Sequence, residues 1–354
     1  MALFHHDNFS VPFESSKEET DSIFENVIES DSNAIAVAIF GAIGVAAIAF
    51  RTLGFLKVLV DVFLRSGINV KKYGAGRGGW AVITGASDGI GKEFAFQLAS
   101  KKLNIVLVSR TESKLKAIAE ELEQKYNIET KHFAMDFTKG SDADYQALQQ
   151  LLNPIEVTVL VNNVGTNHEI PTPFEQEDDK VIKDIIEVNV NAAMKMTKIV
   201  VPQMVARKSG LIINLGSFAG LVPTPFLSVY SGSKAFLSSW SQAIGAELAP
   251  KGILVQNVNT YFVVSAMSKI RRASMLIPMP KPYVRSVLGQ LGISGGASTP
   301  YTSTPFYSHA IANWLIDNVF SRGFWVKQNY NIQVDIRKRA LRKREREAAA
   351  AKSQ

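Results

Sequence analysis

The sequence predicts an α/β protein with a doubly wound parallel sheet and an N-terminal membrane anchor. Short aliphatic and β-branched runs, typical of strands buried on both faces, alternate along the chain with amphipathic helical patterns. This alternation predicts the parallel sheet. A run of seventeen residues without a charge, at 34–50, predicts the anchor. With 354 residues, 46% of them hydrophobic, the chain is long enough for one large domain with extensions.

The N-terminal segment, residues 1–33, is acidic. It holds eight carboxylates against Lys17 alone and has no sustained periodicity, so we expect a solvated, poorly ordered tail. The tail contains a glycosylation sequon, Asn8-Phe9-Ser10, which is usable only if this segment is lumenal.

The uncharged run predicts a transmembrane helix over residues 34–51. A signal peptide is disfavoured because the run starts far from the N-terminus without a basic flank before it; a buried core helix is the other alternative. Six cations follow the run between residues 51 and 77, whereas only Lys17 precedes it. The positive-inside rule therefore places the chain after residue 51 in the cytosol. Residues 52–79 are expected to form an interfacial helix and a glycine-rich linker.

A glycine loop follows the first predicted strand. Ala81-Val82-Ile83 forms the strand, Thr84–Gly91 turns out of it, and Lys92–Lys101 has the pattern of an amphipathic helix. This arrangement predicts a phosphate site, because glycines let an anion approach the backbone N–H groups at the positive end of the helix dipole. The letters G-x-G-x-x-G also occur at Gly74–Gly79, before the strand, and we assign them to the linker.

The second predicted strand, Asn104–Ser109, ends at Arg110. In a dinucleotide fold this position lies beside the adenosine ribose, where a carboxylate favours a free 2′-hydroxyl and a guanidinium pairs with a 2′-phosphate. Because Arg110 stands here and the first carboxylate is Glu112, the sequence predicts NADPH as the cofactor. The alternative is that Arg110 merely ends the strand.

Further strands and helices complete the predicted sheet domain, residues 80–264. A third strand ends before Asp136, and later strands are expected at 157–161, 211–215 and 252–258, with helices at 114–125, 180–204 and 230–248. The chain has no cysteine and its five histidines show no ligand spacing beyond one adjacent pair, so we expect no metal site.

Tyr230 and Lys234 stand four residues apart at the start of a predicted helix, so their side chains share a face. An ammonium near a phenol lowers the phenol's pKa, and Ser217, after a parallel strand, lies at the edge where such sheets bind ligands. Together they suit ketone reduction, with Tyr230 as the acid. Tyrosine and lysine at this spacing are common on ordinary helices, so the pair alone does not decide the question.

Several motifs occur in a fixed order over residues 80–260: the glycine loop T-G-x-x-x-G-x-G, N-N-x-G at Asn162, Asn189, G-S-x-A-G around Ser217, and Y-x-x-x-K. In this order they resemble the short-chain dehydrogenase/reductase family, which has a Rossmann-like fold. The resemblance implies that Asn189 joins the catalytic residues through a water relay to Lys234. It implies a homodimer, and cofactor contacts from Gly85, Ser87, Asp88, Gly89, Ile90, Gly91, Arg110, Asp136, Asn162, Tyr230, Lys234, Val263 and Ser265.

The N-terminal span, the glycine-loop stretch, LIINLGSFAG and PFLSVYSGSKAFLSSWS resemble the microsomal very-long-chain 3-oxoacyl-CoA reductases of fungi, relatives of the 17β-hydroxysteroid dehydrogenase type 12 group. The resemblance implies reduction of a long-chain 3-oxoacyl-CoA at the endoplasmic reticulum membrane, with elongase-cycle enzymes as partners. Thr260 and Ser265 replace a usual Pro and Thr. A ketosteroid or an acyl-dihydroxyacetone phosphate as substrate, and a non-catalytic cofactor-binding scaffold, are the alternatives.

The last quarter of the chain, residues 265–354, is predicted to contact the substrate and the membrane. Residues 265–305 combine apolar side chains with five cations. This composition suits a lid that covers an acyl chain carried on CoA. A solvated helix face has the same pattern and is the alternative. Within 306–354, the stretch 307–320 is too polar to span a membrane alone, so we expect interfacial contact or packing on the core. The basic run 337–346 favours an anionic leaflet over nucleic acid.

Overall fold

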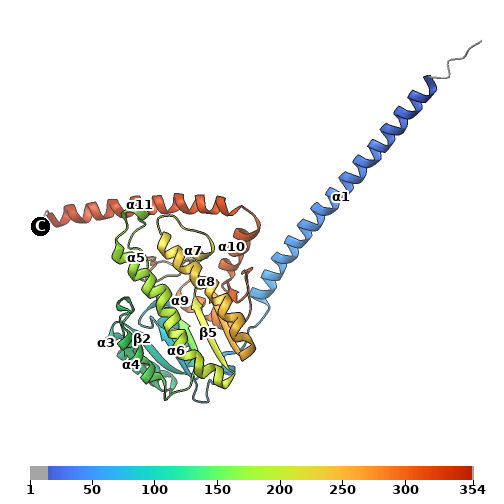
Figure 1. Cartoon of the computed structure of the whole chain (residues 1–354). Coiled ribbons are helices and arrows are strands. Elements are labelled where there is room, and N and C mark those ends of the chain that lie inside the picture. The colour runs from blue at the N-terminus through green and yellow to red at the C-terminus, as the bar shows by residue number, and fades with distance from the viewer. Residues whose placement is uncertain (1–14, 353–354) are drawn as a thin grey trace, which may run out of the picture. The chain divides into compact units, whose positions relative to one another are not determined.

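The computed structural model describes residues 15–352 (Figure 1). The sequon at Asn8 and the first fourteen residues of the acidic segment lie outside the described residues. The chain divides after Leu56 into two compact units.

Helix α1 (Ser15–Phe63) is continuous over 49 residues and differs from the expected division into tail, span and interfacial helix. No proline interrupts this stretch, so the helical hydrogen bonds continue through the acidic, uncharged and mixed parts alike. Its segment Asp31–Phe63, 33 residues long and containing an 18-residue window with a mean hydropathy of 2.2, is long and apolar enough to cross a membrane.

The second unit is built on one parallel sheet of seven strands, in the order β3-β2-β1-β4-β5-β6-β7. The strand order reverses between β1 and β4, which is the switch point where such sheets bind ligands. The observed sheet confirms the predicted fold class. The strands are β1 (Trp80–Thr84), β2 (Asn104–Ser109), β3 (Thr130–Ala134), β4 (Val157–Asn162), β5 (Gly210–Leu215), β6 (Ile253–Val258) and β7 (Thr302–Ser303).

Helices cover both faces of the sheet (Figure 1). Because side chains alternate along a strand, Ala81 and Ile83 of β1 enter one apolar core while Trp80 and Val82 enter the other. The helices are α2 (Gly89–Ser100), α3 (Glu112–Tyr126), α4 (Asp142–Leu152), α5 (Asp179–Ile186), α6 (Ala192–Arg207), α7 (Phe218–Leu221), α8 (Ser228–Leu248), α9 (Pro280–Gly289), α10 (Tyr307–Asn318) and α11 (Arg322–Lys352).

The helix expected over 180–204 is divided into α5 and α6 by a π-helical turn, Glu187–Asn191. The amide of Ala192 bonds the carbonyl of Glu187, five residues earlier, which inserts an extra residue into the turn. The turn buries the side chain of Asn189.

Much of the segment expected to form a lid, residues 265–305, belongs to the packed sheet domain. Helix α9 packs against α2, and Tyr283, Val284 and Val287 are fully buried in the core. Strand β7 then extends the sheet, so the reductase domain continues past residue 264. The segment beside the ligand-binding edge is 261–279, and below we call it the lid.

The basic C-terminal run belongs to helix α11, which is longer than the expected tail. Arg337 donates to the carbonyl of Pro171 at 2.7 Å, and Arg344 pairs with Glu169 at 2.9 Å. Two of the cations expected to face a membrane are therefore engaged with the loop after β4.

Candidate active site

A cavity of about 680 Å³ opens at the carboxyl ends of the strands. Its wall draws on the segments after β1 to β6 and on α10 and α11. The predicted residues that line it are Gly85, Ser87, Asp88, Gly89, Ile90, Arg110, Asp136, Ser217, Tyr230, Lys234, Val263 and Ser265. These predicted residues come from five loops and from helix α8, and they meet at one cavity.

Two of the loop glycines, Gly89 and Gly91, serve different purposes. Gly89 has φ +56°, and a side chain there would have only the Ser265 Cβ nearby, at 3.5 Å, so its backbone is open to a ligand. A side chain at Gly91 would lie 2.2 Å from the Gly85 carbonyl oxygen. Gly91 therefore lets helix and loop pack closely, and it does not line the cavity. Asp88 caps α2 by accepting from the Gly89 amide at 2.7 Å.

One end of the cavity is polar and carries Arg110 and Asp136. Burial works to raise the pKa of Asp136, but hydrogen bonds from Thr138 and the charges of Arg110 and Lys139 outweigh it and hold the pKa below its usual range. Asp136 is therefore ionised at neutral pH beside an exposed guanidinium. This end suits a phosphorylated ribose and an adenine ring.

Asn162 stabilises the central sheet and does not line the cavity. Its side chain is 4% exposed, and its amide nitrogen donates to Thr197 and to Asn214, at 3.0 and 2.8 Å. These bonds tie β4 to β5 and α6, away from the cavity. The next residue, Asn163, does line the cavity and donates to the carbonyls of Thr84 and Gly85, at 2.9 and 3.2 Å. Asn163 thereby holds the glycine loop.

Tyr230, Ser217 and Lys234 meet in the middle of the cavity. Tyr230 and Lys234 lie in the first turns of α8, and Ser217 caps α7 by accepting from the Ala219 amide at 3.1 Å. The Ser217 hydroxyl acts on the Tyr230 phenol in the direction that lowers its pKa. Lys234 is 6% exposed and donates to the Leu215 carbonyl at 2.8 Å, so its ammonium is fixed at the end of β5.

The expected lowering of the Tyr230 pKa by Lys234 is corrected by the structure. Burial raises the pKa of Tyr230, and the Ser217 hydroxyl opposes this only in part. The Lys234 nitrogen lies 5.8 Å from the centre of the Tyr230 ring and directs a hydrogen bond to Leu215. Burial lowers the pKa of Lys234 itself to about 8.

Asn189 does not line the cavity but holds its neighbours. Its side-chain amide donates to the Thr166 carbonyl and the Ser233 hydroxyl, at 2.9 and 3.0 Å, and accepts from the Thr166 amide at 2.8 Å. A side chain at Gly165 would meet both the Asn189 oxygen, at 3.4 Å, and the Lys234 nitrogen, at 3.8 Å. Asn189 is therefore close to Lys234 without a direct bond to it.

The other end of the cavity is largely apolar, and sequence reasoning missed much of it. The lid contributes Tyr261, Phe262 and Met267. Helices α10 and α11 contribute Ile316, Trp325, Ile332 and Ile336. The helical spacing of Ile332 and Ile336 was the available signal, but only the fold shows that α11 crosses over the sheet's ligand-binding edge.

His309 fastens the lid from outside the cavity. Its Nε2 lies 3.0 Å from the Leu276 carbonyl, and the rings of Phe218, Tyr261 and Phe306 surround it at 5.1 to 6.1 Å. Burial lowers the pKa of His309 to about 4, although its contact with the Leu276 carbonyl opposes this, so the imidazole is neutral at pH 7.

A family model described as short chain dehydrogenase matches residues 79–275. The chain belongs to the short-chain dehydrogenase family. As a member of this family it is an oxidoreductase that binds a nicotinamide cofactor, in agreement with the open glycine loop and the polar end of the cavity.

Relatives of this short-chain dehydrogenase include a very-long-chain 3-oxoacyl-CoA reductase of Neurospora crassa, 50% identical over 86% of this chain and 93% of the relative. Among solved structures, a 7beta-hydroxysteroid dehydrogenase has a TM-score of 0.64 at 20% identity over 74% of this chain and 99% of that one. This likeness shows the fold alone. A short-chain dehydrogenase of Sphingobium yanoikuyae in complex with NADPH has a TM-score of 0.54 at 28% identity over 59% of this chain and 82% of that one.

Proposed function

We propose that this short-chain dehydrogenase reduces 3-oxoacyl-CoA to 3-hydroxyacyl-CoA in very-long-chain fatty acid elongation, with NADPH as the reductant. The observation that carries the proposal is the meeting of Tyr230, Ser217 and Lys234 between a polar and an apolar end of one cavity. The name of the Neurospora crassa relative supports the substrate class. The polar end suits the cofactor and the apolar end suits an acyl chain.

The chain's own residues account for the acid step. When bound, the nicotinamide cofactor supplies the hydride that adds to the carbonyl carbon. The Tyr230 hydroxyl then donates its proton to the carbonyl oxygen, which becomes the alcohol, and the Ser217 hydroxyl holds that oxygen by a hydrogen bond. Lys234, fixed by the Leu215 carbonyl, stabilises the phenolate that Tyr230 leaves behind. Asn189 bonds Ser233, the residue before Lys234, and the loop at Thr166.

NADPH is preferred to NADH in this proposal because Arg110 is exposed at the polar end of the cavity and is available to a 2′-phosphate. The NADPH-bound relative at 28% identity supports the same choice.

We further propose that the enzyme is a single-pass protein of the endoplasmic reticulum membrane with its catalytic unit in the cytosol. Support comes from the 33-residue apolar segment and from the cations that follow residue 51. Elongase-cycle enzymes as partners, and a homodimer, belong to the same proposal.

The decisive experiment is NADPH oxidation by the detergent-solubilised protein with a long-chain 3-oxoacyl-CoA, compared with the Tyr230→Phe variant. Because the phenol is the acid, we expect turnover to fall by about 10²–10⁴-fold while NADPH binding is retained. Wild-type protein that binds NADPH but leaves the thioester unreduced would contradict the proposal. A ketosteroid or an acyl-dihydroxyacetone phosphate would then be tested as substrate, and failure of all three would favour a scaffold.

A further inference from the structure

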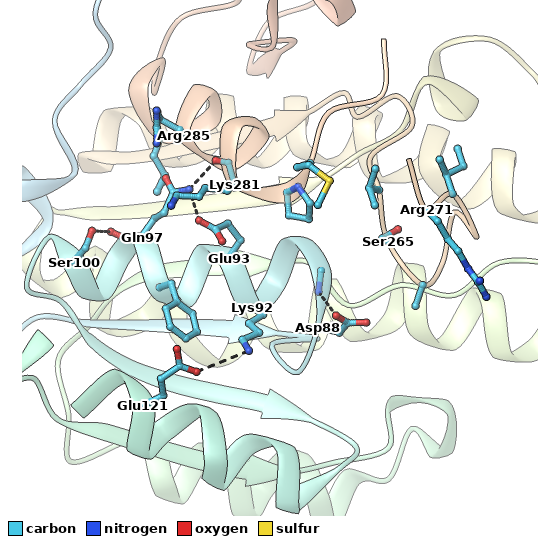
Figure 2. A pocket seen from close by; sticks show the side chains of 18 of the residues that line it. Asp88, Lys92, Glu93, Gln97, Ser100, Glu121, Ser265, Arg271, Lys281 and Arg285 are labelled. Atoms are coloured by element: carbon cyan, nitrogen blue, oxygen red, sulfur yellow. Dashed lines mark hydrogen bonds and ion pairs between the residues drawn. The ribbon is translucent and has the colours of Figure 1, made fainter. Parts of the chain in front are cut away.

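A second cavity, of about 1600 Å³, lies beside the catalytic one, between α2, α3, α9 and the lid (Figure 2). We propose that this cavity, the carrier groove, binds the phosphorylated nucleotide of the CoA carrier while the acyl thioester occupies the catalytic cavity. The inference rests on the proposed function, because it assigns a place to the part of the substrate that does not react.

The charge of the carrier groove favours a polyanion. Eight lysines and arginines line it against three acidic residues. Two of the acidic residues are already engaged, since Asp88 caps α2 and Glu121 lies 4.0 Å from the Lys92 ammonium. Of the other cations, Lys343 pairs with Glu347 at 3.6 Å. Within residues 15–352 no ion pair neutralises the rest, which include the exposed Arg271, Lys281 and Arg285.

Figure 2 shows how these cations are distributed: Lys281 and Arg285 lie on α9 above Gln97 of α2, and Arg271 lies on the lid side of Asp88 and Ser265. The Gln97 amide donates to the Lys281 carbonyl at 2.9 Å, so α9 is held against α2. The cations therefore sit on two walls of a fixed groove rather than on one flexible loop. A ligand with several separated phosphates would contact both walls.

The floor of the groove also suits an aromatic base. Phe96 and Tyr126 are half-buried there, with ring centres 6.3 Å apart. The ammonium groups of Lys92 and Lys125 lie over the Phe96 ring, at 5.3 and 5.7 Å from its centre. Aromatic faces beside cations bind a purine and its phosphates together.

The two cavities adjoin and share part of their wall. Asp88, Gly89, Ser265, Ala266 and Lys269 line both of them. A thioester placed at Tyr230 can therefore extend a flexible arm past the lid and deliver phosphate groups to the groove. CoA has this construction, with a pantetheine arm between its sulfur and a 3′-phosphorylated ADP.

The test compares two substrates with the same acyl chain, 3-oxoacyl-CoA and the 3-oxoacyl thioester of pantetheine, which lacks the nucleotide. We expect the double variant Lys281→Ala/Arg285→Ala of the full-length protein to raise KM for the CoA thioester about tenfold more than KM for the pantetheine thioester. The matched control, Lys198→Ala/Lys251→Ala, removes two exposed cations elsewhere and should leave the ratio of the two KM values at its wild-type level.

A binding measurement separates this inference from the proposed reaction. Titration calorimetry of CoA, dephospho-CoA and pantetheine into NADPH-saturated protein needs no turnover, so it reports on the groove even if the reacting ketone is a different one. We expect CoA to bind most tightly and the Lys281→Ala/Arg285→Ala variant to lose about tenfold in CoA affinity. The assignment would be overturned if the variant lost as much affinity for pantetheine as for CoA. It would also be overturned if the variant lost affinity only for NADPH, or only for vesicles containing phosphatidylserine.

Discussion

At Tyr230, burial has two consequences that suit reduction. It raises the pKa of the phenol, so the hydroxyl is protonated and ready to donate at neutral pH. It also makes the phenolate left after donation costly, because no water solvates it. The fixed ammonium of Lys234, whose pKa burial lowers to about 8, is the charge nearby that offsets this cost.

The Lys234 pKa predicts the alkaline limit of the enzyme. The ammonium is present below about pH 8 and is lost as the pH rises through that value, so we expect kcat/KM for reduction to fall above pH 8, approaching tenfold per pH unit. Initial rates with NADPH and 3-oxoacyl-CoA between pH 6.5 and 9.5 measure this limit. A profile that stays flat from pH 7 to 9.5 would refute the assigned role of the ammonium.

Arg110 predicts cofactor selectivity. Replacing the guanidinium by a carboxylate in Arg110→Asp introduces repulsion for a 2′-phosphate and an acceptor for a 2′-hydroxyl, so we expect NADPH affinity to fall about 10- to 100-fold and NADH affinity to improve. Fluorescence titration with both cofactors measures the change. Lys116→Ala is the control, because this exposed lysine pairs with Glu112 at 2.8 Å outside the cavity. Unchanged selectivity in Arg110→Asp would mean that Arg110 only ends the strand.

At the scale of elements, the sequence predicted best those segments whose structure depends on local pattern. Buried strands such as β2 and β5 are continuous apolar runs, and the glycine loop marks the start of α2. The π-helical turn around Asn189 could not be predicted, because it depends on bonds to Thr166 and Ser233 in distant segments. The same limit explains α9, which has the cations of a lid but is buried through Tyr283 against α2.

The contact between α10 and the lid predicts a stability change with pH. The folded-state pKa of His309 is about 4 against an ordinary value of 6.5, so the unfolded chain binds more protons between these values. The contribution of His309 to the free energy of unfolding should therefore be complete above pH 6.5 and be lost as the pH falls toward 4. We expect the loss from this group to be about 3 kcal/mol. Urea unfolding followed by tryptophan fluorescence at pH 7 and pH 5 measures the difference.

The His309→Gln variant should lose most of that pH dependence, since it removes the titrating ring. His132→Gln, in the edge strand β3, is the control and should keep it. Identical slopes in wild type and His309→Gln would show that another group carries the effect.

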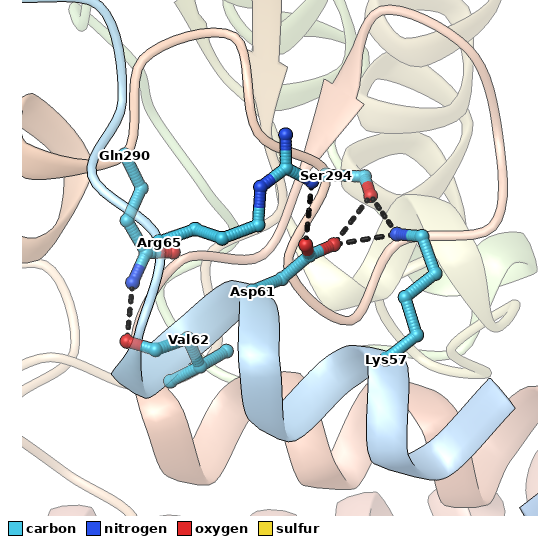
Figure 3. A network of polar contacts seen from close by, with 6 residues as sticks. All are labelled: Lys57, Asp61, Val62, Arg65, Gln290 and Ser294. Carbon is cyan, nitrogen blue, oxygen red and sulfur yellow. Dashed lines mark hydrogen bonds and ion pairs between the residues drawn. The ribbon is translucent and has the colours of Figure 1, made fainter. Parts of the chain in front are cut away.

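At the scale of the whole molecule, the end of α1 is fastened to the reductase body by a buried carboxylate (Figure 3). The Asp61 side chain is 1% exposed and pairs with Lys57 at 2.5 Å and Arg65 at 2.8 Å, each four residues away along the chain. Its contact with the body is Ser294, whose hydroxyl donates to the carboxylate at 3.4 Å. The Gln290 amide donates to the Val62 carbonyl at 2.9 Å, in the same junction. The chain that follows is also paired, since the amides of residues 67 and 68 donate to the carbonyls of residues 289 and 291, each at 2.8 Å.

The contacts of Asp61 lead to a prediction about the stability of this junction at the last turns of α1. Asp61→Ala removes two charge-assisted hydrogen bonds, and we expect it to destabilise the junction by about 1–3 kcal/mol. Trypsin should then cut the segment 65–72, which contains Arg65, Lys71 and Lys72, several-fold faster and release the reductase unit from membranes. Asp335→Ala is the control, because its pair with Arg339 at 2.9 Å is exposed on both sides and contributes little. Equal cleavage rates in wild type and Asp61→Ala would mean that the backbone pairing at residues 67 and 68 holds the junction alone.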